Sequence, residues 1–135
     1  MKKMEADTFK LTVHPNGYTE LLIKHNAIFD VNDIQESKKL IIQELKEKKA
    51  YILVEAEGTF YTSKEARELG ASDTHATHHG AIAFCSDKLA YKLLGKLYIR
   101  INRPKVPTKY FTARKEAISW LLSIMEKNSK KNEKN

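Results

Sequence analysis

Two short segments near the start of the chain alternate apolar and polar residues, as half-buried strands do. Residues 9–14 (FKLTVH) alternate in this way, and residues 18–24 (YTELLIK) do so again. Pro15, Asn16 and Gly17 lie between them and form a turn signal. Because the connection is so short, we expect the two segments to pair as a β-hairpin.

The apolar positions then change to a helical spacing. From residue 30 to residue 49, lysines and glutamates cover most of the surface and one stripe is apolar. The members of this stripe are Val31, Ile34, Ile41 and Leu45. Asn32 followed by Gln35 resembles a capping box, which is a signal for the start of a helix.

Two continuous apolar runs predict strands that are buried on both faces. They are residues 50–56 (AYILVEA) and residues 80–86 (GAIAFCS). Between them, residues 63–69 (SKEAREL) are predicted to form a short helix that Gly70 stops.

Two longer helices are predicted in the second half of the chain. Asp87 is expected to cap the first, which runs to about Ile101 with leucines turned inward. Those leucines are Leu89, Leu93, Leu94 and Leu97. After two prolines, residues 109–112 (KYFT) are predicted to form a strand, and Thr112 is expected to cap the last helix. The buried stripe of that helix is predicted to be Ala117, Trp120, Leu121, Ile124 and Met125.

The predicted order is therefore β-β-α-β-α-β-α-β-α, which belongs to the α/β class. A hairpin followed by βα units predicts a mixed β-sheet with four helices packed on it. Residues 8–127 are expected to form a single domain, since no repeat or interior linker interrupts them. Residues 128–135 are polar and rich in lysine, and we expect them to be a disordered basic tail.

Four strings along the chain resemble one fold family. They are ILVEAEG, SKEAREL, GAIAFCSDKLAYKLLGKLYIRINRPKVPTKYFT and KEAISWL. Together they resemble the STAS-like (SpoIIAA-like) fold of the bacterial anti-sigma-factor antagonists, which is related to the CRAL-TRIO lipid-binding fold. The sequence is more closely similar to a family of small, uncharacterised bacterial STAS-like proteins. This resemblance implies the mixed sheet that the pattern predicts, and it implies no settled function.

Composition narrows the class of protein. No apolar run approaches the ~20 residues that span a bilayer, so we expect no transmembrane segment. The first residues, MKKMEADTFK, lack the apolar region of a secretory signal, and the lone Cys85 cannot form an internal disulfide. A cytoplasmic location follows as an expectation. Because Cys85 lies in an apolar strand, we expect its thiol to be unreactive.

The net charge of +7 is partly organised along one predicted helix. Lys88, Lys92, Lys96 and Arg100 recur every four residues and would form a basic ridge. Such a ridge could bind phosphates or an anionic membrane surface, or it could be the solvated side of an amphipathic helix. A nucleic-acid partner is disfavoured, because the sequence has neither an aromatic platform for single strands nor a helix-turn-helix signature.

Thr62 and Ser63 lie where a predicted strand gives way to a predicted helix. The resemblance to the anti-sigma-factor antagonists places their phosphorylated serine at Ser63 and their aspartate at Thr62, although the aspartate, a second Ser/Thr and a glycine are missing here. The resemblance therefore implies that Thr62 and Ser63 are candidates for a phospho-switch or a partner surface, and a phosphate would suit this place because helix N-termini favour anions. The alternative is a capping box, in which the Thr62 hydroxyl accepts from the Glu65 amide and Glu65 reaches back to Thr62.

His75, His78 and His79 are weak candidates for a metal site. Zinc needs three or four converging ligands, and this string is not an H-E-x-x-H motif. The alternative is a polar loop before a strand. No cofactor is predicted, and the sequence contains no paired catalytic carboxylates, Gly-rich phosphate loop or nucleophile elbow. We therefore do not expect an enzyme.

Two functions lead, and an enzyme that uses the histidines is a third and weaker interpretation. The first is a non-enzymatic regulatory module that binds a protein partner through the surface around Thr62 and Ser63. The second is a module that binds a lipid or small hydrophobic ligand in a pocket between the sheet and residues 88–101, with the basic ridge meeting its head group. An exposed edge of the hairpin at residues 9–24 could also pair two copies into a homodimer.

Overall fold

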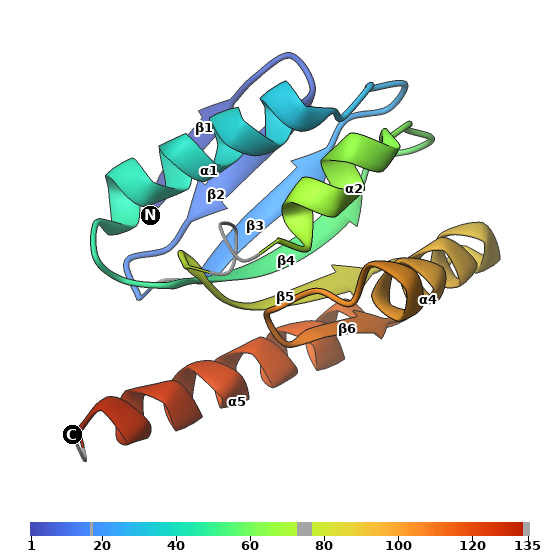
Figure 1. Cartoon of the computed structure of the whole chain (residues 1–135). Coiled ribbons are helices and arrows are strands. Elements are labelled where there is room, and N and C mark those ends of the chain that lie inside the picture. The colour runs from blue at the N-terminus through green and yellow to red at the C-terminus, as the bar shows by residue number, and fades with distance from the viewer. Residues whose placement is uncertain (17, 73–76, 134–135) are drawn as a thin grey trace.

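One six-stranded sheet forms the centre of the computed structural model, which describes residues 1–16, 18–72 and 77–133 (Figure 1). Its strands stand in the order in which they occur along the chain. The antiparallel neighbours are β1 (Lys2–Glu5), β2 (Phe9–Val13) and β3 (Tyr18–Ile23). The strands that continue in parallel from β3 are β4 (Ala50–Ala56), β5 (His79–Cys85) and β6 (Thr108–Phe111).

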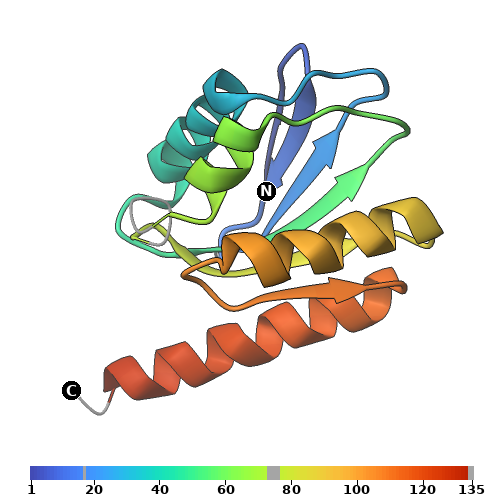
Figure 2. The ribbon, with the colours of Figure 1, turned by 45° about the vertical axis from the view of Figure 1, so that its right-hand side comes forward.

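Helices cover both faces of this sheet (Figure 2). Three of them each connect two parallel strands and lie on one face: α1 (Val31–Leu45), α2 (Lys64–Gly70) and α4 (Leu89–Asn102). The last helix, α5 (Arg114–Glu133), lies on the other face. Parallel connections are right-handed, so three successive ones that advance in the same direction place their helices on the same side.

The mixed sheet and the four helices of the described residues confirm the α/β fold predicted from the sequence. The sequence missed β1, because the segment KKME has one inward apolar side chain, Met4, and therefore shows no alternation. The sheet thus begins before residue 8, where the domain was predicted to start. Because β2 also pairs with β1 and β3 also pairs with β4, the hairpin has no free edge, and the homodimer route predicted from it is wrong.

Two apolar clusters lie on opposite faces of the sheet. The cluster on the α1 side contains Phe9, Leu11 and Ile52. The cluster on the α5 side contains Leu53 of the sheet and Leu121 of α5. Successive residues of a strand point to opposite faces, so neighbouring Ile52 and Leu53 belong to different clusters. This arrangement confirms that β4 is buried on both sides, as its continuous apolar run predicted.

Helix α5 continues much further than the sequence indicated. It begins at Arg114 rather than directly after Thr112, and it extends to Glu133. Near its end, the amide nitrogen of Asn128 donates to the Tyr51 hydroxyl at 2.9 Å, and Lys130 pairs with Glu126 at 3.2 Å. The prediction of a disordered tail from residue 128 is therefore wrong for residues 128–133, because a contact with the sheet and an i,i+4 pair support the helix.

Two predicted helix starts lie at different residues. The capping box of α1 consists of Asp30 and Asp33, not Asn32 and Gln35: Asp30 accepts from the Val31 amide, and Asp33 accepts from the Asp30 amide, both at 2.8 Å. At α4 the N-cap is Lys88, and no side chain caps the helix, so the prediction that Asp87 caps it is also wrong.

Candidate functional site

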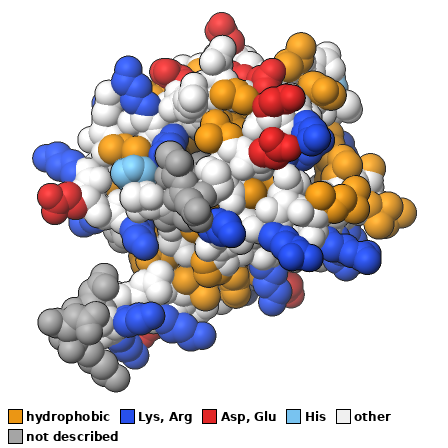
Figure 3. Space-filling model, in the orientation of Figure 1, with side chains coloured by type: hydrophobic (Ala, Val, Ile, Leu, Met, Phe, Trp, Pro, Cys, Tyr) orange, Lys and Arg blue, Asp and Glu red, His pale blue; other side chains and the backbone are white. Residues whose placement is uncertain are grey.

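The outer side of α4 carries an unusual row of exposed aliphatic side chains. Between 50% and 69% of each of these residues is accessible to solvent: Leu89, Leu93, Leu94, Leu97 and Ile101. We call them the α4 apolar face. Figure 3 shows hydrophobic side chains gathered over the position of α4, with lysine and arginine side chains beside them. Clusters of exposed apolar residues of this kind mark interaction sites, whereas single exposed leucines do not.

Helix α4 packs on the protein through a different row of residues. Tyr91 stacks on Phe60 with ring centroids 5.5 Å apart, and Tyr98 meets Phe84 edge-on at 5.6 Å. The Tyr91 hydroxyl also donates to the Gly58 carbonyl at 2.7 Å. Between the two tyrosines lies Gly95, where an added Cβ would come 2.8 Å from the Tyr110 ring. Aromatic rings and a glycine, spaced one helical turn apart, therefore form the inner side of α4.

The prediction that Leu89, Leu93, Leu94 and Leu97 point inward is wrong. Two rows along α4 have helical spacing, one of leucines and one of Tyr91, Gly95 and Tyr98, and hydrophobicity alone favours the leucines. Because Gly95 has no side chain, the Tyr110 ring can approach the helix closely. This contact determines that the row with Gly95 faces the sheet. A tyrosine-glycine-tyrosine row at this spacing is the sequence signal that could have identified the inner side.

The predicted basic ridge lies along one flank of the α4 apolar face. Its members are Lys88, Lys92, Lys96 and Arg100, at the N-cap and along the helix. With 100° between successive helical residues, these four positions occupy the sector between the inner side and the leucines. No aspartate or glutamate occurs within Leu89–Asn102. The helix therefore presents an apolar strip bordered by cations.

Ser63 is engaged in holding two helices together. Its hydroxyl oxygen accepts from the Ala66 amide at 3.0 Å, which makes Ser63 the N-cap of α2, and its proton is donated to the Asp30 carboxylate. Only 9% of Ser63 is exposed. The bond from Ser63, followed by that from the Val31 amide, lowers the pKa of Asp30. Since Asp30 caps α1, this pair ties the starts of α1 and α2 together.

Thr62 is not the cap that the sequence predicted. Its carbonyl accepts from the Arg67 guanidinium at 2.7 Å, and the helix starts after Ser63. The backbone of Ser63 is extended, as an N-cap requires, so the capping role moves one residue along the chain. The predicted partner surface or phospho-switch at Thr62 and Ser63 stays a prediction, but the Ser63 hydroxyl already has a donor and an acceptor as partners.

The histidine candidates do not come together in the part of the chain that the structure describes. His75 lies outside the described residues; His78 is half-buried, and His79 is buried at the start of β5. Among residues 1–16, 18–72 and 77–133, no group of three His, Cys, Asp or Glu side chains could hold a metal ion. Cys85 is buried, and burial raises the pKa of its thiol.

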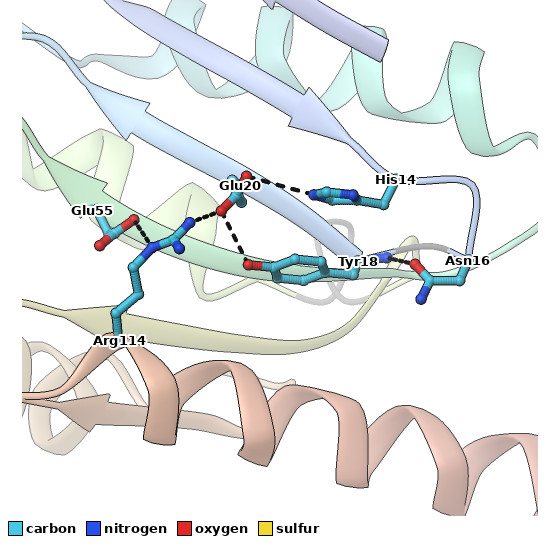
Figure 4. A network of polar contacts seen from close by, with 6 residues as sticks. All are labelled: His14, Asn16, Tyr18, Glu20, Glu55 and Arg114. Atoms are coloured by element: carbon cyan, nitrogen blue, oxygen red, sulfur yellow. Dashed lines mark hydrogen bonds and ion pairs between the residues drawn. The ribbon is translucent and has the colours of Figure 1, made fainter. Parts of the chain in front are cut away.

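A polar network that sequence reasoning missed joins α5 to the sheet (Figure 4). Arg114 pairs with Glu20, and its Nε donates to Glu55 at 3.2 Å. The Tyr18 hydroxyl donates to Glu20 at 3.2 Å, and His14 stacks on Tyr18 with centroids 4.7 Å apart. Burial raises the pKa of Glu55. Glutamates inside otherwise apolar strands were the signal that such a network exists.

A small polar hollow opens where β4 and β5 end. It measures about 280 Å³, and its lining includes Glu55, Glu57, Asp87, Lys88 and Arg114. In α/β sheets, ligands commonly bind beyond the carboxyl ends of the parallel strands, and this hollow lies there. Its charges of both signs already include the Arg114–Glu55 pair, so we do not assign it a ligand.

Comparisons with known proteins identify the family and the fold. The model of a family described as a domain of unknown function (DUF7793) matches residues 15–125. A crystal structure of an uncharacterised DUF3478-family protein from Shewanella loihica PV-4, with a SpoIIAA-like fold, is similar to this chain. The two share 15% identity with a TM-score of 0.51, over 87% of this chain and 98% of that one. No curated protein matches the sequence. The STAS-like (SpoIIAA-like) fold predicted from the sequence is therefore confirmed.

Proposed function

We propose that this chain, which belongs to the family described as a domain of unknown function (DUF7793), is a non-enzymatic module that binds an anionic lipid surface through α4. The observation that carries this proposal is the α4 apolar face, whose five aliphatic side chains are at least half exposed. No helix in the described parts of the chain is long and apolar enough to cross a membrane. The interaction we propose is with the surface of a bilayer, because the apolar face and the basic ridge lie on the outside of α4.

The apolar and charged residues of α4 are arranged as in helices that lie in a membrane interface. Such helices bury leucines at the boundary between head groups and acyl chains and keep lysines and arginines at the head groups. On α4 the leucines point away from the sheet, and the basic ridge borders them. Each lysine or arginine near an anionic surface contributes about 1 kcal/mol, so the ridge would add about 4 kcal/mol to what the leucines contribute.

The same geometry argues against the internal lipid pocket that the sequence suggested. The space between α4 and the sheet is occupied by the rings of Tyr91, Tyr98 and Tyr110. The leucines expected to line that pocket lie on the opposite side of the helix. We therefore place the lipid contact outside the fold, and the kinship with CRAL-TRIO proteins stays a prediction.

Co-sedimentation with vesicles tests the leucines. We expect the protein to bind vesicles that contain phosphatidylglycerol, and the double variant Leu93→Glu, Leu97→Glu to lose most of that binding. Leu122→Glu on α5 is the matched control, because Leu122 is 41% exposed but lies on another helix, and it should bind as the unaltered chain does. Circular dichroism verifies that all variants are folded. Equal binding by the Leu93, Leu97 variant and the control would refute the proposal.

The basic ridge has its own test. Lys92→Glu together with Lys96→Glu should weaken binding to anionic vesicles, whereas Lys39→Glu on the exposed side of α1 should change it little. Binding should also fall as salt rises, since surface charges are screened within ~10 Å at 0.1 M salt. Vesicles of phosphatidylcholine alone should bind weakly. Undiminished binding by the Lys92, Lys96 variant would rule out a role for the ridge.

A protein partner is the second candidate function, and one observation favours it. Ala90, Leu94, Leu97 and Ile101 on α4 are spaced by four, three and four residues, which is the spacing of a seam between two paired helices. A photo-crosslinking amino acid at Leu94 should then give one discrete protein adduct in cells, and the same probe at Leu122 should not. This outcome, combined with absent vesicle binding, would favour a protein partner over a lipid surface.

A further inference from the structure

The outer edge of β6 is the second surface that could receive a partner. β6 ends the sheet, and Figure 2 shows it at the margin between α4 and α5. The carbonyls of Pro107 and Phe111 accept from the amides of Ile82 and Ser86 on the β5 side, at 2.9 and 3.1 Å. Because backbone groups in a parallel strand alternate in direction, those of Thr108 and Tyr110 point to the side where the described residues form no neighbouring strand.

A shallow hollow of about 570 Å³ lies beside this edge on the α5 side. Phe111 of β6 and Trp120 of α5 contribute its aromatic part, with ring centroids 5.6 Å apart at an angle of 48°. Both rings are half-buried, so each keeps an accessible surface. Alternate side chains of a strand added at this edge would point to the α5 side of the sheet. An apolar side chain among them would contact the two rings.

Lysines border the hollow and determine which charge it would attract. Lys109 lies 5.4 Å from the centre of the Phe111 ring, and Lys115 lies on the first turn of α5. Glu116 is the one acidic residue in the lining, so the hollow has a net positive charge. Acidic side chains of a partner are favoured at such a site.

The two edges of the sheet differ in their protection. At the other edge, Lys2, Lys3 and Glu5 are exposed charges of both signs, which is a common defence against strand addition. Strand β6 has only Lys109 as a charged residue. A second copy pairing through β6 in the antiparallel sense would bring the Lys109 side chains of both copies onto the same face, where like charges oppose association. The charge pattern thus favours an acidic peptide over a second copy.

We propose that β6 accepts an extended peptide segment of a partner protein as a seventh strand. An aromatic or aliphatic side chain of that segment contacts Phe111 and Trp120. A carboxylate two positions away, on the same face of the added strand, lies beside Lys109 and Lys115. Backbone hydrogen bonds supply affinity and the hollow supplies selectivity, as in other cases of strand addition. This inference does not depend on the α4 apolar face.

Selection of random heptapeptides displayed on phage against the full chain provides the probe. We expect the enriched peptides to combine an aromatic or β-branched residue with acidic residues two positions away. In nuclear magnetic resonance spectra, a synthetic enriched peptide should shift the amide signals of β6 and the indole signal of Trp120. Enrichment of no common sequence, or signal shifts confined to other elements, would refute the inference.

Variants at Thr108 distinguish strand addition from simple contact with the hollow. Thr108→Pro removes an edge amide without touching the bonds to β5, and proline is tolerated on edge strands in that orientation. We expect it to weaken binding of the enriched peptide about tenfold, because the added strand loses a hydrogen bond and meets the proline ring. Thr108→Val keeps the backbone amide and with it the hydrogen bond to the added strand. Its affinity for the peptide should therefore stay within about threefold of that of the unaltered chain. Equal loss in both variants would refute strand addition.

Two further measurements complete the test. Trp120→Ala should weaken the peptide while leaving the chain folded, as judged by circular dichroism and by an unchanged shift pattern of β2 and β3. Sedimentation velocity shows whether the chain associates with itself. A dimer that Thr108→Pro abolishes would show that a second copy occupies the edge, and it would overturn the assignment to an acidic peptide.

Discussion

At the residue scale, Ser63 shows how one hydroxyl can serve two helices. It caps α2 through the Ala66 amide and donates to Asp30, the residue that caps α1. Phosphorylation of Ser63 would replace the hydroxyl proton that Asp30 accepts. It would also place two negatively charged groups in contact. Modification here would therefore weaken the contact between the starts of α1 and α2. Modification of an exposed hydroxyl would disturb no such contact.

Replacing Ser63 and Thr62 separately tests this role. Ser63→Ala should lower the free energy of unfolding by about 1–3 kcal/mol, because a cap is lost and a carboxylate loses its donor. Thr62→Ala should change it by less than about 0.5 kcal/mol, since among the described residues the Thr62 carbonyl, and not its side chain, makes a hydrogen bond. Urea unfolding measures both values. Equal effects of the two substitutions would show that the capping role is shared or misplaced.

At the scale of the element, α4 shows what the periodicity of a sequence can and cannot determine. The 3.6-residue spacing correctly predicted a helix over these residues, as alternation and apolar runs predicted β2, β3, β4 and β5. The choice between two rows of the same helix depended on whether Tyr110, from β6, could approach Gly95. That contact joins different elements, and a pattern within one helix carries no record of it.

Glycine-to-alanine substitutions in two helices separate this contact from helix propensity. Alanine normally stabilises a helix interior by about 1 kcal/mol relative to glycine. At Gly95, however, a Cβ would lie 2.8 Å from the Tyr110 ring, whereas at Gly70 the nearest atom is 3.4 Å away. Gly95→Ala should therefore lower the unfolding midpoint in urea, and Gly70→Ala should leave it unchanged or raise it. A stabilising Gly95→Ala would mean that the Tyr110 ring moves aside freely.

At the scale of the whole molecule, the polar network attaches α5 to strands far away in the sequence. Arg114 lies 59 residues from Glu55 along the chain, yet their side chains are 3.2 Å apart. Sequence patterns over short windows predicted the helices, strands and fold class, but no such pattern links these two residues. The network and the exposed side of α4 depend on contacts between different segments, which is why they were missed, whereas β1 was missed because its own residues show no alternation.

The stability of the whole fold should respond to pH through His14. Burial, the N-terminal amine and the Arg114 guanidinium lower the pKa of His14. Glu20 lies 3.5 Å from His14 but already pairs with Arg114, so it does not offset these effects. An unfolded chain takes up this proton near pH 6.5, and the folded chain takes it up only at lower pH. The stability that His14 contributes is therefore complete above about pH 6.5 and is lost as the pH falls towards the lower pKa of the folded state.

Urea unfolding between pH 8 and pH 5.5 measures this dependence. The unaltered chain should lose stability as the pH is lowered, and His14→Gln should lose less, since its side chain does not titrate. The difference between the two slopes isolates His14 from the carboxylates, which change together in both proteins. Parallel slopes would show that His14 titrates alike in the folded and unfolded chains.

The order of the strands also has a consequence for how the chain folds during synthesis. Each strand pairs with the one made just before it, so the sheet can grow from β1 towards β6 as the chain leaves the ribosome. The short loops of the antiparallel pairs β1–β2 and β2–β3 favour rapid pairing there, whereas the parallel pairs close over a whole helix and pair more slowly. Among the described helices, α5, the last element, is the one that covers Leu53, Ala81 and Ala83. Until α5 has formed, the sheet of the growing chain would therefore keep one apolar face bare, the stage at which a chaperone would bind this chain most tightly.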